Sequence, residues 1–229
     1  MTLLTTGNPK IIKGRRKGYL SFILHLAPAT LSGYQACPRS SEGCRGACLN
    51  SAGRGGIFRK GETTNAIQQA RIRKTVMFFE DRPSFMKQLV RETHAGIQLA
   101  ARHDLTPCFR LNGTSDVRWE LHGIIEEFPH VQFYDYTKII NRNIGHLPNY
   151  HLTFSRSESN ALDVALAFSR GMNVAIVFRK PLPLAYMNRK VIDGTEHDLR
   201  FLDPPNVWVS LNAKGKGKKD TTGFVVSAV

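Results

Sequence analysis

Three of the four cysteines in this 229-residue chain lie in one short segment, Ala36-Cys-Pro-Arg-Ser-Ser-Glu-Gly-Cys-Arg-Gly-Ala-Cys48, shortly after an apolar run. Thiolates are soft ligands that select zinc, copper(I) or an iron–sulfur cluster. Because such clusters are usually held by four cysteines, ligation by Cys37, Cys44 and Cys48 alone would leave one iron without a protein thiolate. We therefore expect a [4Fe-4S] cluster on this segment, with reactivity at its open iron.

Zinc binding and a disulfide bond are the two alternatives for the clustered thiols. Zinc fits the Cys44-x3-Cys48 spacing and Cys108 supplies a fourth thiolate, but the gap between Cys37 and Cys44 is wide for a zinc knuckle. A structural disulfide requires an oxidising compartment, and residues 1–7 lack the basic and apolar regions of a signal peptide. Iron–sulfur ligation is the interpretation that we favour, with zinc as the alternative cofactor.

The composition indicates one globular domain over residues 1–229. Hydrophobic residues make up 41% of the chain and include 13 phenylalanines, and no Pro/Gly/Ser-rich linker divides it. The longest apolar run, 19–31, is interrupted by Ser21, His25 and Pro28 and is too short to span a bilayer. We expect a soluble, cytoplasmic protein with no membrane contact.

The net charge of +14 is concentrated at the two ends of the chain. Lys13-Gly-Arg-Arg-Lys17 lies in a basic segment 1–18, and Lys214-Gly-Lys-Gly-Lys-Lys219 lies in a basic loop 213–220. Such clusters attract nucleic acid or small anionic substrates. Glycine rather than an aromatic residue separates the lysines, so a stacking platform for single strands is not expected. Weak, non-specific nucleic-acid binding is the prediction, and a basic nucleic-acid-binding module with a structural metal is one alternative function.

Apolar runs of strand length alternate with stretches of helical period, which is typical of βα units. Strands are predicted at 19–26, 108–112, 131–137, 151–155, 173–178, 206–211 and 223–227, and helices at 64–79, 83–102 and up to about residue 129. Ser155-Arg-Ser-Glu158 matches a capping box that opens a further helix, which Gly171 closes. These units are too few for an eight-fold barrel. We predict an α/β fold with a partial (β/α) barrel, TIM-like but incomplete, and with the cysteine loop after its first strand.

Function in such folds gathers at the carboxyl ends of the strands. The polar residues at these ends are Asn112, Thr114, Ser115, Asp116, Tyr136, Thr137, Lys138, Ser155 and Ser157. Because the cysteine loop opens on the same edge, we expect one shared pocket. Cys108 lies at the opposite end of its strand, roughly 13 Å from Asn112 at about 3.3 Å per residue. It should therefore be a buried free thiol.

Several segments resemble the phage-associated gene product 88-like family over most of the chain. These are the cysteine loop, Arg110-Leu-Asn-Gly-Thr-Ser-Asp116, Tyr134-Asp-Tyr-Thr-Lys138 and the closing Asp193-Gly-x3-Asp198…Ala213-Lys-Gly…Asp220-x2-Gly-Phe224. The three clustered cysteines form the recurring motif of that family. The resemblance implies a viral or prophage origin, and hence the cytoplasm of a bacterial host, without specifying an activity.

A more distant resemblance is to radical S-adenosylmethionine enzymes, which also carry three cysteines after the first strand of a partial barrel. Their spacing is three then two residues, whereas here it is six then three. The second strand also ends in Asn-Gly-Thr-Ser-Asp116 instead of the Gly-Gly-Glu-like segment that binds the methionine amino group. Radical S-adenosylmethionine chemistry is therefore an alternative. The favoured hypothesis is a Lewis-acid lyase or desulfidase acting on a small substrate such as a thiol amino acid.

Such a lyase needs a base beside the substrate carboxylate and a cation to hold that carboxylate. Lys138 is the candidate base and Tyr136 a hydroxyl donor, with Asp116 and Ser115 as orienting groups. The purely structural alternatives for these residues are an exposed lysine, a core tyrosine and a helix cap at Ser115-Asp116. The candidate substrate-binding residues are Asn112, Thr114, Ser155, Ser157 and Arg54, the last as a carboxylate clamp.

Overall fold

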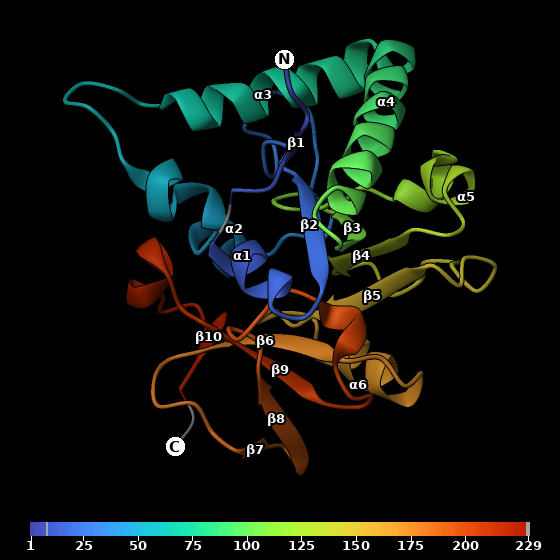
Figure 1. The fold of residues 1–229 in the computed structure, drawn as a ribbon. Helices are drawn as coiled ribbons and strands as arrows, with labels where there is room; N and C mark the ends of the chain where they lie inside the picture. Colours follow the sequence, from blue (N-terminus) through green and yellow to red (C-terminus); the bar gives the residue numbers. More distant parts are fainter. Residues whose placement is uncertain (8, 228–229) are drawn as a thin grey trace.

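A computed structural model describes residues 1–7 and 9–227, and its centre is a ten-stranded sheet (Figure 1). From one edge to the other the strands are β1 (Leu4–Thr5), β2 (Tyr19–Leu24), β3 (Thr106–Arg110), β4 (Gln132–Thr137), β5 (Tyr150–Ser155), β6 (Val174–Phe178), β9 (Trp208–Asn212), β8 (Arg189–Asp193) and β7 (Ala185–Tyr186). The tenth, β10 (Val225–Val226), pairs with the end of β6. The seven strands predicted from apolar runs are confirmed, with ends that differ by a few residues.

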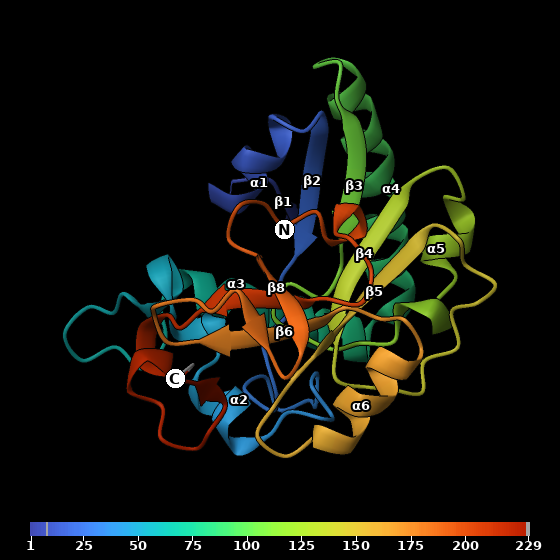
Figure 2. The same ribbon diagram turned by 90° about the horizontal axis from the view of Figure 1, so that it is seen from below.

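The sheet is open, and its two edges are antiparallel. Strands β2, β3, β4, β5, β6, β9 and β8 are paired in parallel, whereas β1 pairs antiparallel with β2, and β7 with β8. Figure 2 shows the strand direction turning from β2 and β3 toward β6, as in other twisted sheets. The α/β class is therefore shown, but the predicted incomplete TIM-like barrel is not, because a short antiparallel strand lies at each edge of the sheet.

The helices occupy the connections between the strands. They are α1 (Pro9–Arg15), α2 (Glu42–Gly46), α3 (Ala66–Glu80), α4 (Arg82–Ala101), α5 (Ile124–Glu127) and α6 (Ala161–Ser169). The two long helices α3 and α4 begin at side-chain caps, because Asn65 accepts from the Gln68 N–H and Asp81 from the Ser84 N–H. Each described helix is too short or too polar to cross a membrane.

The two faces of the sheet are covered differently. On one face, Phe22, Phe109 and Phe133 pack in a core with residues of α3 and α4, and the Phe22 and Phe109 rings stack 4.9 Å apart. Because side chains alternate along a strand, Cys108, Arg110 and Tyr134 point to the other face. That face is covered by residues 193–203, which we call the strap; its 3-10 helix is η4 (Arg200–Leu202).

The strap is held by one ion pair and by aromatic contacts. The Arg110 Nη1 and Asp198 Oδ2 atoms lie 2.9 Å apart, and both side chains are largely buried. The Phe201 ring lies 5.1 Å from the Tyr19 ring and 5.4 Å from the Tyr134 ring, measured between centroids. The strap therefore fills the space in front of β2, β3 and β4.

Two local predictions are wrong. The capping box at Ser155–Glu158 does not open a helix, because α6 begins at Ala161 and its N-cap is Asn160. Ser115 and Asp116 are not a helix cap either, since the next elements are the 3-10 helix η3 (Trp119–Leu121) and the short α5. Instead, the Glu158 carboxylate accepts hydrogen bonds from Ser41 and Gly43, and the Asp116 carboxylate accepts one from the Lys138 N–H.

Candidate functional site

The cysteine loop, residues 36–52, follows β2 at the carboxyl edge of the parallel strands. The prediction placed it after the first strand, but β1 precedes β2, so β2 is the second strand of the chain. Cys44 lies in α2, and Cys48 is the residue before the 3-10 helix η1 (Leu49–Ser51). Cys37, Cys44 and Cys48 are all half-buried and free of disulfide bonds.

One end of the loop is attached to the residues that follow β3. The Asp116 N–H donates to the Ala36 carbonyl at 2.8 Å, and the Cys37 thiol donates to the Thr114 carbonyl at 3.6 Å. The Thr114 hydroxyl in turn donates to the Leu26 carbonyl at 2.5 Å. The cysteine loop and the polar turn after β3 therefore lie together, as the topology of parallel strands predicts.

The middle of the loop is anchored by Glu158, which follows β5. Its carboxylate accepts the Ser41 hydroxyl and the Gly43 N–H, both at 2.8 Å. Ser41 also caps α2 by accepting from the Cys44 N–H at 3.2 Å. A Cβ at Gly43 would collide with the Thr222 and Phe224 side chains, so glycine is required for this close approach. Glu158 thus positions the helix that carries Cys44.

The three thiols are electrostatic neighbours. Burial raises the pKa of Cys37 to about 12, and the nearby Cys48 and Cys44 add to that effect. Burial also raises the pKa of Cys48, an effect that Cys44 reinforces and that the charges of Arg71 and Lys138 oppose. A neighbouring cysteine raises the pKa of a thiol because two thiolates at short range would repel each other. The fold therefore gathers the three cysteines that the sequence singles out.

Among the described residues, no group of three or more His, Cys, Asp and Glu side chains is arranged to hold a single metal ion. Ligands around one zinc ion must all lie within about 2.3 Å of it. Thiolates on a cubane cluster bind different irons, so they stand further apart. Soft thiolates are the donors that zinc and iron–sulfur clusters both use. Metal ligation itself stays a prediction.

Cys108 lies elsewhere in the sheet. It is fully buried near the start of β3, and its Sγ is 3.1 Å from the Ser21 hydroxyl. It packs with Tyr134 and with Leu199 of the strap. Burial raises its pKa to about 12. Cys108 is therefore the buried free thiol that was predicted. It lies within β3, whereas Thr114, the contact of Cys37, lies beyond the carboxyl end of that strand.

Lys138 and Asp116 meet beside the cysteine loop, at the end of β4. The Lys138 N–H donates to Asp116 Oδ2 at 2.7 Å, and the Lys138 Nζ lies 5.7 Å from the Phe224 ring centroid. Burial raises the pKa of Asp116, and hydrogen bonds from Lys138 and Thr137 oppose that rise. The positive charge of Lys138 opposes the rise in the pKa of Cys48.

Other predicted site residues serve the surrounding turns. The side-chain oxygen of Asn112 accepts three hydrogen bonds. The donors are the Ser115 hydroxyl at 2.9 Å, the Val117 N–H at 2.8 Å and the Trp119 ring N–H at 3.1 Å. Its amide nitrogen donates to the Val117 carbonyl. Asn112 and Ser115 therefore stabilise the turn after β3, and these bonds occupy the Asn112 side chain.

The described contacts of Tyr136, Ser155, Ser157 and Arg54 are with groups other than the three thiols. Tyr136 points toward the strap, with the Arg110 guanidinium 4.6 Å from its ring centroid, and burial raises its pKa to about 12. Ser155 and Ser157 are bound through their backbone groups by Asn160. Arg54 is exposed in the 3-10 helix η2 (Gly53–Gly56). The residues that gather at the cysteine loop are Thr114, Asp116 and Lys138.

Two residues at the loop were not predicted. Arg71 of α3 donates to the Asn50 side chain at 2.6 Å, and its positive charge lowers the pKa of Cys48. Glu158 belongs to a sequence that also matches a capping box. A helical period identifies α3, but it does not show that a charged residue of that helix turns toward a loop some 20 positions earlier.

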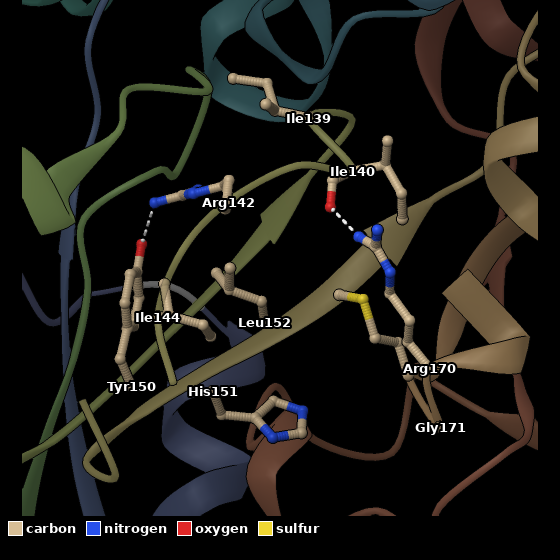
Figure 3. A pocket seen from close by; sticks show the side chains of 10 residues that line it. Ile139, Ile140, Arg142, Ile144, Tyr150, His151, Leu152, Arg170 and Gly171 are labelled. Carbon is tan, nitrogen blue, oxygen red and sulfur yellow. Dashed lines mark hydrogen bonds between the residues drawn. The ribbon is translucent and has the colours of Figure 1, made fainter. Parts of the chain in front are cut away.

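A separate pocket of about 300 Å³ lies between the β4–β5 connection and the end of α6 (Figure 3). Its walls combine Ile140, Ile144 and Leu152 with two arginines. Those arginines have internal partners, because Arg142 donates to the Tyr150 hydroxyl at 2.9 Å and Arg170 to the Ile140 carbonyl at 2.8 Å (Figure 3). None of the residues that line this pocket belongs to the cysteine loop.

These observations define an α/β protein with a thiol-rich loop at the carboxyl edge of its parallel strands. A family model described as gene product 88 matches residues 2–228. The chain therefore belongs to the gene product 88 family of phage proteins. No curated protein and no solved structure matches it, so the resemblance to radical S-adenosylmethionine enzymes receives no support.

Proposed function

We propose that this member of the gene product 88 family is an iron–sulfur enzyme that acts on a small anionic substrate. Cys37, Cys44 and Cys48 would hold a [4Fe-4S] cluster, with one iron left for the substrate. The observation that carries the proposal is the position of these thiols at the carboxyl edge of the sheet, where Cys37 donates to the Thr114 carbonyl, Cys44 lies in α2 and Cys48 precedes η1. Cys108, the other cysteine, is buried next to Ser21.

The donor set fits such a cluster. Thiolates are the ligands that iron–sulfur clusters use, and three of them leave one iron open to exchange. Burial favours the neutral thiol form of Cys37 and of Cys48, because it raises the pKa of both. A bound metal deprotonates such a thiol, so the binding of the cluster would release protons.

When bound, the cluster supplies a Lewis acid for a substrate thiol, carboxylate or hydroxyl. The protein supplies cations and a proton acceptor around it. Arg71 places positive charge beside Cys48, which favours an anionic substrate at that position. Asp116 holds the Lys138 backbone through a 2.7 Å hydrogen bond. Lys138 would take the proton next to the substrate carboxylate, and Arg71 would hold that carboxylate.

Chemistry of this kind suits a sulfur-removing lyase with a cysteine-like substrate. The test is the electron paramagnetic resonance spectrum of the reduced, anaerobically prepared protein, recorded with and without L-cysteine, together with an assay for released sulfide. We expect L-cysteine to change the spectrum and sulfide to be released. Lys138→Met should keep the spectrum and lose sulfide release, whereas Lys87→Met, a change on α4, should alter neither.

The contrary results are equally specific. A spectrum that is unchanged by L-cysteine, with no sulfide released, would contradict the lyase proposal. If the spectrum changed with S-adenosylmethionine and not with L-cysteine, the protein would instead be a radical S-adenosylmethionine enzyme. Full activity in Lys138→Met would remove this lysine as the base.

A further inference from the structure

The basic loop near the end of the chain packs against the cysteine loop. Its lysines lie in the 3-10 helix η5 (Gly215–Lys219) and next to it, and Figures 1 and 2 both place this segment near α2. A Cβ at Gly215 would lie 3.1 Å from the Ser51 carbonyl, and one at Gly217 would lie 3.2 Å from the Ala47 Cβ. Gly215 also has a left-handed backbone, with φ +51°. The glycines that separate the lysines therefore allow close contact between the two loops.

A pocket of about 200 Å³ lies at this contact. Its lining comprises Gly46, Ala47, Lys216, Lys219, Asp220, Thr221 and Thr222. Gly46 and Ala47 belong to the segment between Cys44 and Cys48, and neighbouring Cα atoms are about 3.8 Å apart. One wall of the pocket is therefore the backbone that carries two of the thiols, and the opposite wall is basic.

The acidic residue in the lining is bound to its own turn. Asp220 accepts the Thr222 hydroxyl at 2.8 Å and the Val225 N–H at 3.0 Å, and these bonds lower its pKa despite some burial. Arg179 donates to the Lys218 carbonyl at 2.6 Å and to the Asp220 carbonyl. Asp220 and Arg179 thus stabilise the turn, while the Lys216 and Lys219 side chains stay exposed at the pocket.

The size and charge of the pocket indicate the kind of group that it fits. Pockets that enclose a whole small ligand usually measure about 300 to 1,000 Å³, so this one suits a single end of a molecule. A phosphate group carries roughly −1.5 to −2 charges near neutral pH. Lys216, Lys219 and the ionised Asp220 give the lining a net charge of +1. Asp220 is engaged by its own turn, so the two ammonium groups are the ones that face an anion, and lysine binds phosphate as a point charge.

We infer that this pocket binds the phosphate group of a phosphorylated small molecule. Resting on the proposed function, this molecule is a substrate with a cysteine-like thiol at one end and a phosphate at the other, and the phosphate anchors it beside the cysteine loop. L-cysteine, the compound used in the test above, represents the thiol end alone. The basic loop then acts in small-molecule recognition, where the sequence alone had suggested nucleic acid.

The test is isothermal titration of the full chain with inorganic phosphate and with pyrophosphate at constant ionic strength. We expect Lys216→Ala and Lys219→Ala each to weaken binding about ten-fold, a change of about 1.4 kcal/mol. Lys214→Ala and Lys218→Ala are matched controls from the same loop but outside the pocket lining, and they should change binding less than two-fold, as a rough bound for remote surface charge. All four lysines are exposed, so folding is not at risk.

Two results would overturn the inference. One is the absence of binding to both anions. The other is equal weakening by all four lysine variants, with a single-stranded oligonucleotide bound more tightly than pyrophosphate, because that pattern describes a diffuse basic surface. Iron and sulfide content measured in the same samples keeps the two proposals separate. Phosphate binding without iron would contradict the proposed function alone, and iron without phosphate binding would contradict the pocket alone.

Discussion

The carboxyl edge of the sheet and its interior both carry cysteine and charged side chains, but in opposite surroundings. At the edge, Cys37 and Cys48 are half-buried, and the charges of Arg71 and Lys138 act on Cys48. In the interior, Cys108 is fully buried against Ser21. The interior polar groups therefore stabilise the fold, whereas we propose that the edge groups bind a ligand. Edge variants should change metal content, and interior variants should change stability.

The largest expected effect separates the four cysteines. Replacing Cys37, Cys44 or Cys48 by Ser should each remove nearly all bound iron, because the cluster would lose one of three protein ligands. Cys108→Ser, the matched interior change, should keep the iron of the unmodified protein. The measurement is iron per folded chain after anaerobic purification. Loss of iron in Cys108→Ser, with folding retained, would show four-thiolate ligation and remove the distinction between edge and interior.

The next effect concerns the interior ion pair that holds the strap. Arg110→Met removes one charge of a largely buried pair and should lower the free energy of unfolding by about 3 to 5 kcal/mol. The half-exposed Arg118 pairs with Glu120, and Arg118→Met should cost less than about 1 kcal/mol. Urea unfolding followed by circular dichroism measures both. If the two variants are equally stable, or if Arg110→Met loses its iron while folded, the interior assignment is wrong.

A pH dependence should come from Asp135, whose carboxylate accepts the Asn112 N–H at 2.6 Å and the Tyr150 hydroxyl at 2.9 Å. Burial raises its pKa to about 7, whereas the unfolded value is about 3.9. Between these values the unfolded chain has already lost the proton that the folded chain keeps. The free energy of unfolding should therefore fall as pH rises from about 4 to about 7, by at most about 4 kcal/mol.

Asp135→Asn should flatten that part of the stability curve, measured by urea unfolding between pH 4 and pH 8. Asp104→Asn, an exposed change, is the control and should leave the curve unaltered. The same slope in Asp135→Asn and in the unmodified protein would show that Asp135 is ionised throughout. The interior would then tolerate a charge that we expect it to exclude.

The smallest expected effect is at the edge. Ser41→Ala removes the cap of α2 and the hydrogen bond to Glu158, and should cost about 1 kcal/mol. It should also accelerate the loss of iron to a chelator, since Ser41 positions the helix that carries Cys44. Ser40→Ala is the neighbouring control, whose backbone carbonyl, and not its side chain, accepts from Arg45. Identical rates of iron loss in the two variants would show that the cap does not hold the ligand in place.

The strand positions could be predicted from the sequence because parallel strands buried on both faces appear as apolar runs. The exceptions are β1, β7 and β8. β1 and β7 are each two residues long, which is too short for an apolar run. β8 begins with the charged residues Arg189 and Lys190, so it does not appear as an apolar run either. The edge pairing that leaves the sheet open depends on these short strands. For that reason the sequence favoured a partial barrel.

The site was predictable in part for a topological reason. Parallel strands place their carboxyl ends at one edge, which brings Thr114, Asp116 and Lys138 to the cysteine loop. Glu158 follows β5 at the same edge, but its sequence also matches a capping box, which hid its contact with the loop. Arg71 could not be predicted in this way, because it lies on α3 and not at the end of a strand. Tyr136 was wrongly expected at the site for the same topological reason. It precedes Lys138 by two residues, but its side chain lies under the strap beside Arg110. Nucleic-acid binding and a cytoplasmic location stay predictions.

The central claim is that three edge thiols of this gene product 88 family member hold a [4Fe-4S] cluster. The most direct test is the iron, zinc and acid-labile sulfide content of the protein purified without oxygen. We expect a brown protein with about four iron and four sulfide per chain. One zinc per chain, with neither iron nor labile sulfide, would contradict the claim and leave the cysteine loop as a structural zinc site.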